Sequence, residues 1–211
     1  MTTVRRNVPV AWGIIFFLIA VVLVFATIRL INDSENLIAG TIPAEGEFDR
    51  RYAEHPVLAY AHILPGVVYL VLAPFQISRR FRNRHLGLHR KMGRILIPTG
   101  IVAGVFGIIF GILYSFGGLA EASASVVFGS WFVFCLAYAY QHIRTGDTVG
   151  HRRWMIRAFA IGLGVGTIRI WVGLFEATGL LEFNDAFGAA FWIAWTMHVM
   201  AAEIWLRWRP T

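Results

Sequence analysis

The segment ILIPTGIVAGVFGIIFGILYSF, residues Ile95–Phe116, contains no charged side chain and decides the class of fold. It is longer than the roughly 20 apolar residues that a helix needs to cross the ~30 Å hydrocarbon core of a bilayer. One helical face carries glycines at steps of four, three and four: Gly100, Gly104, Gly107 and Gly111. Small residues let transmembrane helices approach closely, so the segment predicts a membrane helix that packs tightly against its neighbours.

Five further segments meet the same requirement for length and polarity: Val10–Leu30, Pro56–Ile77, Ala122–His142, Trp154–Phe175 and Ala186–Leu206. The composition agrees, because 57% of the 211 residues are hydrophobic and only 15% are charged. We therefore predict an all-α fold, a polytopic membrane helix bundle with six transmembrane helices. It would form a single integral membrane domain, 1–211, with a signal-anchor helix (1–30), an external loop (31–55) and a five-helix core (56–206).

The charged residues sort to two sides of the predicted bundle. One side carries most of the basic residues, seven of them in the stretch before the third span: Arg79, Arg80, Arg82, Arg84, Arg90, Lys91 and Arg94. By the positive-inside rule this side, with both termini, is cytoplasmic, which points to the bacterial cytoplasmic (inner) membrane. We expect the seven residues to contact anionic lipid headgroups. The net charge of +7 is spread over short loops without interleaved aromatic residues, so we expect no nucleic-acid partner.

Two predicted spans contain ionisable side chains inside the membrane. The second span has a polar and small-residue face that includes His62 and Gln76. In the fifth span Arg169 lies on a face of small residues, where its charge costs on the order of 3 kcal/mol and needs a partner. Glu176 lies two turns further along and is the nearest acid. Because His62 and Arg169 reach similar depths, roughly 10 Å from the outer end, we predict a polar pocket of His62, Gln76, Arg169 and Glu176.

The histidines suggest a cofactor. Imidazole binds haem iron, copper and zinc, and a b-type haem in a helix bundle takes two axial histidines at similar depth, with arginines near its propionates. The candidate ligands are His62, His89, His142, His151 and His198. For the histidines in the basic loops an interfacial role is the simpler interpretation, and His62 has no depth-matched partner. Cys135 is the only cysteine, which excludes an intrachain disulfide.

Several motifs resemble a known family. They are His62-x-x-Pro65-Gly66, Pro74-Phe75-Gln76, His89-Arg90-x-x-Gly93-Arg94 and the run His151–Arg157. Together they resemble the bacterial membrane-protein family named domain of unknown function 2306, over roughly Tyr52–Arg169. The resemblance implies a multi-pass membrane protein but no established activity or substrate. It also implies that the family's motif positions fall here on His62, Gln76, His89, Arg94, His151, Arg157 and Arg169.

Three functions remain open from the sequence. The first is a haem b-binding electron-transfer protein, with a copper ion as a lesser variant. The second is a transporter or sensor for a small solute or proton, with a His62 and Arg169 pocket. The third is a non-catalytic accessory subunit, and the glycine faces also suit a homo-oligomer or a partner membrane subunit. Hydrolytic motifs are absent from the sequence, so we leave open whether the protein is an enzyme.

Overall fold

The computed structural model describes the backbone of residues 3–208 and the side chains of residues 9–208, and it is helical with no strand in that range. The outer limits of the predicted domain, 1 and 211, lie outside the described residues. The long helices are α1 (Thr3–Ala39), α3 (Pro56–Ile77), α5 (Leu86–Leu113), α6 (Gly118–Arg144), α7 (Thr148–Thr178) and α8 (Phe183–Trp208). All six are long and apolar enough to cross a membrane, which confirms the predicted polytopic bundle.

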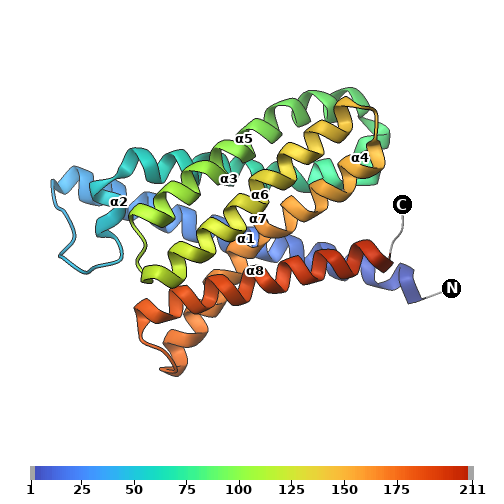
Figure 1. Cartoon of the computed structure of the whole chain (residues 1–211). Helices are drawn as coiled ribbons and strands as arrows, with labels where there is room; N and C mark the ends of the chain where they lie inside the picture. The colour runs from blue at the N-terminus through green and yellow to red at the C-terminus, as the bar shows by residue number, and fades with distance from the viewer. Residues whose placement is uncertain (1–2, 209–211) are drawn as a thin grey trace.

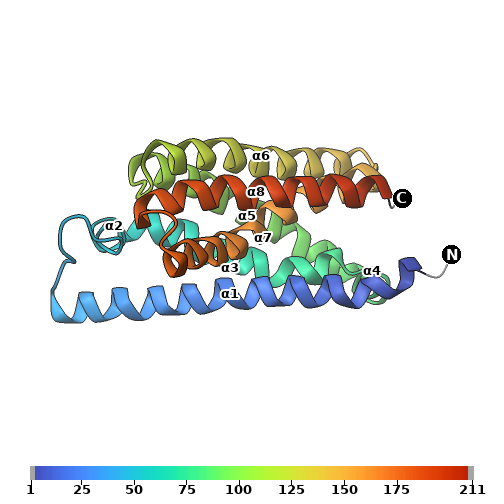
Figure 2. The ribbon, with the colours of Figure 1, turned by 90° about the horizontal axis from the view of Figure 1, so that it is seen from below.

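Four of these helices, α3, α5, α6 and α7, form a four-helix core in which each packs against its two neighbours. α3 therefore stands opposite α6, and α5 stands opposite α7. α8 packs against α6 and α7, while α1 packs against α7 and α3. Figures 1 and 2 show the start of α1 and the end of α8 at the same end of the bundle as the short α4 (Arg79–Arg84). We call this the basic end, and the opposite end, with α2 (Arg50–Glu54), the acidic end.

The helices extend beyond the segments that hydropathy marks. The external loop was predicted from residue 31, but α1 continues to Ala39, and α2 interrupts the remainder of the loop. Polar residues can continue a helix once it leaves the hydrocarbon: Arg29 pairs with Asp33 one turn on, at 2.7 Å. The left-handed backbone of Gly40, φ +66°, then ends α1. At the basic end α5 begins at Leu86 rather than Ile95, so three of the predicted headgroup residues lie on α5, and the other four lie on α4.

The glycine face of α5 packs closely against its neighbours, as predicted. A Cβ placed on Gly104 would lie 2.7 Å from Val133 and 2.9 Å from the Phe132 ring, both on α6. On Gly107 it would lie 2.7 Å from Nδ1 of His62 on α3. On Gly111 it would lie 2.5 Å from the hydroxyl of Ser125. These distances leave no room for a methyl group, so the glycines set the spacing of α5 from α3 and α6.

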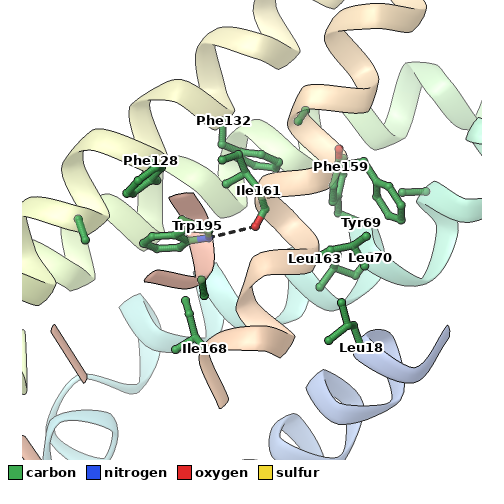
Figure 3. Close-up of a cluster of buried hydrophobic side chains, with 14 of the residues drawn as sticks. Leu18, Tyr69, Leu70, Phe128, Phe132, Phe159, Ile161, Leu163, Ile168 and Trp195 are labelled. Atoms are coloured by element: carbon green, nitrogen blue, oxygen red, sulfur yellow. Dashed lines mark hydrogen bonds between the residues drawn. The ribbon is translucent and has the colours of Figure 1, made fainter. Parts of the chain in front are cut away.

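A second set of contacts ties α8 and α1 to α7. The indole of Trp195 lies against Gly164, and its N–H donates a hydrogen bond of 3.0 Å to the carbonyl of Ile161 (Figure 3). On another face, a Cβ on Gly166 would meet the backbone of Leu18 in α1. α7 is therefore the helix on which the peripheral helices are assembled.

We expect Gly104→Ala to lower the free energy of unfolding by about 1–3 kcal/mol, because the added methyl overpacks the α5–α6 contact. Gly13→Ala is the matched control, since Gly13 lies in α1 and no atom comes within 4 Å of the position that its Cβ would take. Unfolding in mixed micelles, followed by circular dichroism, measures both. Equal stability of the two variants would contradict a packing role for the α5 glycines.

Candidate functional site

A cavity of about 450 Å³ lies inside the acidic half of the bundle. Its wall includes residues 59–70 of α3, 103–111 of α5 and 161–176 of α7, with contributions from α1, α2, α6 and α8. Most of the lining is apolar or aromatic, and several core glycines face it. Cavities of this size and character are typical of sites for small molecules. We take this cavity as the candidate site.

His62 lies in the cavity wall with one ring nitrogen already engaged. Its Nδ1 is 2.8 Å from the carbonyl oxygen of Ala103. A carbonyl only accepts, so Nδ1 carries the proton in this contact. Nε2 is then left with a lone pair and forms no hydrogen bond within the described chain. This is the arrangement that orients an imidazole for a ligand or a metal.

Arg169 lies in the same cavity wall. Its positive charge acts on His62, and its guanidinium lies 5.5 Å from the ring centre of Phe25 on α1. Glu176, the nearest acid in the sequence, does not pair with Arg169, which forms no salt bridge to any described residue. Glu176 lines the outer part of the cavity but is exposed, because two helical turns separate it from Arg169.

The prediction that Gln76 joins this pocket is also wrong. Gln76 is buried near the basic end of α3, fourteen residues from His62 and thus about 21 Å away along the helix. Sharing a helical face did not bring it to the same depth. Its Oε1 lies close to Gly93 of α5, and its Nε2 has no hydrogen-bond partner among the described residues.

The acidic end of the cavity is covered by a cluster that the sequence did not reveal. Arg51 on α2 donates to Glu121 at 3.1 Å and to the carbonyl of Tyr114 at 2.8 Å. Its guanidinium lies 4.4 Å from the ring centre of Phe48. The side chains of Arg51 and Glu121 are nearly buried, with exposed fractions of 11% and 4%. Arg29 on α1 is held by Asp33 and Asp49. We call Arg29, Asp49, Arg51 and Glu121 the outer ion-pair cluster.

Two predicted ligands, His89 and His151, lie on facing core helices at the basic end. His89 and His151 are each the fourth residue of their helix, α5 and α7, which stand opposite each other in the core. The charges of His151 and Arg82 act on His89. Nδ1 of His151 is 2.9 Å from the carbonyl of Ala139, whereas Nδ1 of His89 is buried without a partner.

Each ring nitrogen of His142 has a partner within the chain. Trp154 donates its indole N–H to Nε2 of His142 at 3.2 Å, and Nδ1 of His142 contacts Asp147 at 2.8 Å. Both nitrogens of His142 are therefore engaged, which argues against its predicted role as a ligand. Asp147 caps α7, and the hydrogen bonds from the backbone of Gly150 and from His142 lower the pKa of its carboxyl group.

His198 lies apart from the other candidates, with Nε2 2.8 Å from the hydroxyl of Thr167. Within residues 9–208, no three His, Cys, Asp or Glu side chains are arranged to hold a metal ion. The lesser alternative of a copper ion stays a prediction. Cys135 is buried and free.

Arg157 has a structural role that the sequence did not assign. Its Nε and Nη2 reach the two oxygens of Glu203 on α8, at 2.5 and 3.0 Å. The guanidinium also lies 4.6 Å from the ring centre of Trp154. A two-point pair of this kind joins α7 to α8 near the basic end.

The residues predicted to contact headgroups lie at the basic end, and most of their side chains are exposed. Arg82 is half-buried and the other six are exposed: Arg79, Arg80, Arg84, Arg90, Lys91 and Arg94. Contact of the apolar helices with lipid follows from the six spans. Contact of these side chains with anionic headgroups stays a prediction.

Replacement of Arg157 by Gln should lower the free energy of unfolding by on the order of 2 kcal/mol, because it leaves a partly buried carboxylate without its charged donor. The double variant Arg157→Glu/Glu203→Arg restores opposite charges and should recover part of the loss. Both are measured as unfolding in mixed micelles. A double variant that is less stable than Arg157→Gln would contradict the pairing.

The motifs described above agree with a comparison to protein families. A family model described as "Predicted membrane protein (DUF2306)" matches residues 59–206, which is more than half of the chain. The matched range contains α3 to α8 almost completely and leaves out α1 and α2. No curated protein and no solved structure matches the chain.

Proposed function

We propose that this chain, which belongs to the DUF2306 family of predicted membrane proteins, binds one small amphiphilic molecule within the membrane and serves as a carrier or sensor for it. One observation carries the proposal. Arg169 lies without an ionic partner in the same cavity wall as His62, whose Nε2 is unbonded. Intramembrane charged groups without partners are typical of substrate sites.

The two side chains are complementary as a recognition pair. The guanidinium donates only, and the Nε2 lone pair of His62 accepts in the tautomer described above. A ligand group that both accepts and donates hydrogen bonds would satisfy both residues. The apolar wall around them would hold the remainder of the molecule and exclude water, which strengthens polar contacts inside.

We also propose that the protein lies in the bacterial cytoplasmic membrane with both termini inside. The basic residues of α4 and of the first turns of α5 support this orientation by the positive-inside rule. The cavity then lies in the external half of the membrane, and the outer ion-pair cluster faces the outside.

A cavity-filling variant tests the function. Native mass spectrometry of protein released from mild detergent should detect one bound small molecule per wild-type chain. Gly66→Phe should abolish it, because Gly66 lines the cavity and only Ala103 approaches its Cβ position, at 4.0 Å. The side chain would thus fill the cavity without breaking the packing.

Gly87→Phe is the matched control, since Gly87 is exposed on α5 outside the cavity. This variant should retain the bound molecule, and both variants should elute as the wild type does. Wild-type protein without any bound small molecule would contradict the proposal. If such protein instead co-purified with another membrane subunit, the accessory interpretation would replace it.

A second candidate function, haem b binding with electron transfer, is favoured by His89 and His151. They lie on opposite core helices near Arg82, and His89 Nδ1 is buried and unpaired. These residues fit axial ligation, with Arg82 suited to a propionate. Haem would supply one-electron redox chemistry. His62 is a weaker ligand candidate, because no second histidine lines its cavity.

Absorption spectroscopy tests this candidate. Protein purified from cells with ample haem should give a reduced-minus-oxidised spectrum with Soret and α bands, and either His89→Ala or His151→Ala should remove them. His85→Ala, which changes an exposed neighbour, should leave the spectrum intact. A featureless wild-type spectrum would eliminate the haem proposal and leave the cavity proposal unaffected.

A further inference from the structure

We propose that the ligand of the cavity is a single-chain amphiphilic carboxylate, of the medium-chain fatty-acid class, that enters from the bilayer. This inference rests on the function proposed above and adds the chemistry of the ligand. Three features of the cavity carry it: its charge, its length and the covering of its outer end.

The charges of the cavity wall leave Arg169 unmatched. Arg29 is paired with Asp33 and Asp49, and Arg51 is paired with Glu121. Glu121 also accepts two backbone N–H groups, from Phe116 and Gly117, so it is fully engaged. The ring of Phe25 gives Arg169 only a cation–π contact. Glu176 also lines the wall but is exposed and seven residues along the helix from Arg169, so an anion bound at Arg169 would supply the ionic partner that this side chain lacks.

A carboxyl group also suits the neighbouring His62. The guanidinium binds a carboxylate through two parallel N–H donors. His62 keeps its proton on Nδ1, at the carbonyl of Ala103, and presents the Nε2 lone pair. In the acid form of the ligand one carboxyl oxygen donates its O–H to Nε2, while the other accepts from Arg169.

The shape of the wall requires a long apolar body. Along α7 the lining runs from Ile161 to Glu176, which is about 22 Å of helix, and Arg169 lies about midway. Between Arg169 and the inner end of the cavity the wall is formed by aromatic and branched side chains, among them Val165, Phe132 and Trp195. An acyl chain can lie along this part while its carboxylate stays at Arg169.

The outer ion-pair cluster indicates where the ligand comes from. Arg51 and Glu121 are nearly buried beside Phe48 and cover part of the acidic end. The exposed carboxylate of Glu176 lines the cavity at that end and would repel an anion that arrives from water. The α1 wall, with Val22 and Phe25, belongs to a helix outside the four-helix core, and an amphiphile dissolved in the bilayer would reach the cavity past this helix.

Decanoate and 1-decanol are the test pair, because they share a tail and differ in the charged group. With the full-length protein in nanodiscs, decanoate should raise the thermal unfolding temperature saturably, and decanol should require at least tenfold higher concentration for the same shift. Arg169→Gln should remove this preference, and Arg169→Lys, which keeps the charge, should retain most of it. Arg84→Gln controls for charge at the membrane surface, since Arg84 is exposed on α4.

The outcomes separate the two proposals. Equal shifts from decanoate and decanol in the wild type, both lost in Gly66→Phe, would overturn the carboxylate inference and leave cavity binding in place. The same result is expected if Glu176 neutralises Arg169 in the membrane. Shifts unchanged in Gly66→Phe would put the binding elsewhere and overturn both. A decanoate preference that persists in Arg169→Gln would overturn the assignment to Arg169.

Discussion

Close approach of α5 to α3 and α6 is the constraint on which the rest of the structure depends. In lipid, burial of apolar surface gives helices little reason to associate, so packing depends on how closely their backbones can approach. Gly104 admits the ring of Phe132, and Gly107 admits the imidazole of His62. With α5 held between α3 and α6, α7 closes the core, and α1 and α8 pack onto α7.

The same contacts create the cavity. Glycines bring the backbones together but fill no volume, so space remains wherever no large neighbour enters. Near Gly100 the space is taken by Tyr69 and Leu136. Gly66 and Gly173 also line the cavity, and neither has an atom closer than 4.0 Å to its Cβ position, so space remains beside them. The packing that stabilises the bundle thus also forms the candidate site.

Residue positions predicted from the rise and periodicity of one helix were accurate for features that lie within that helix. The six spans and the glycine face of α5 follow from helical rise and periodicity. Such predictions failed where position along the axis or partners on other helices mattered. Gln76 shares a face with His62 but not a depth, and Glu176 does not reach Arg169. The partners of Arg51 and Arg157 are 70 and 46 residues away in the chain, beyond any local pattern.

The sequence by itself determined the membrane class, the helical spans and the separation of basic from acidic ends, because hydrocarbon thickness and backbone hydrogen bonding act on each segment independently. Only the tertiary structure decided which polar residues meet. It brought His89 opposite His151, engaged both nitrogens of His142, and left Arg169 without an anion. Those outcomes depend on the rotation and offset of one helix against another, which side-chain packing sets across the whole bundle.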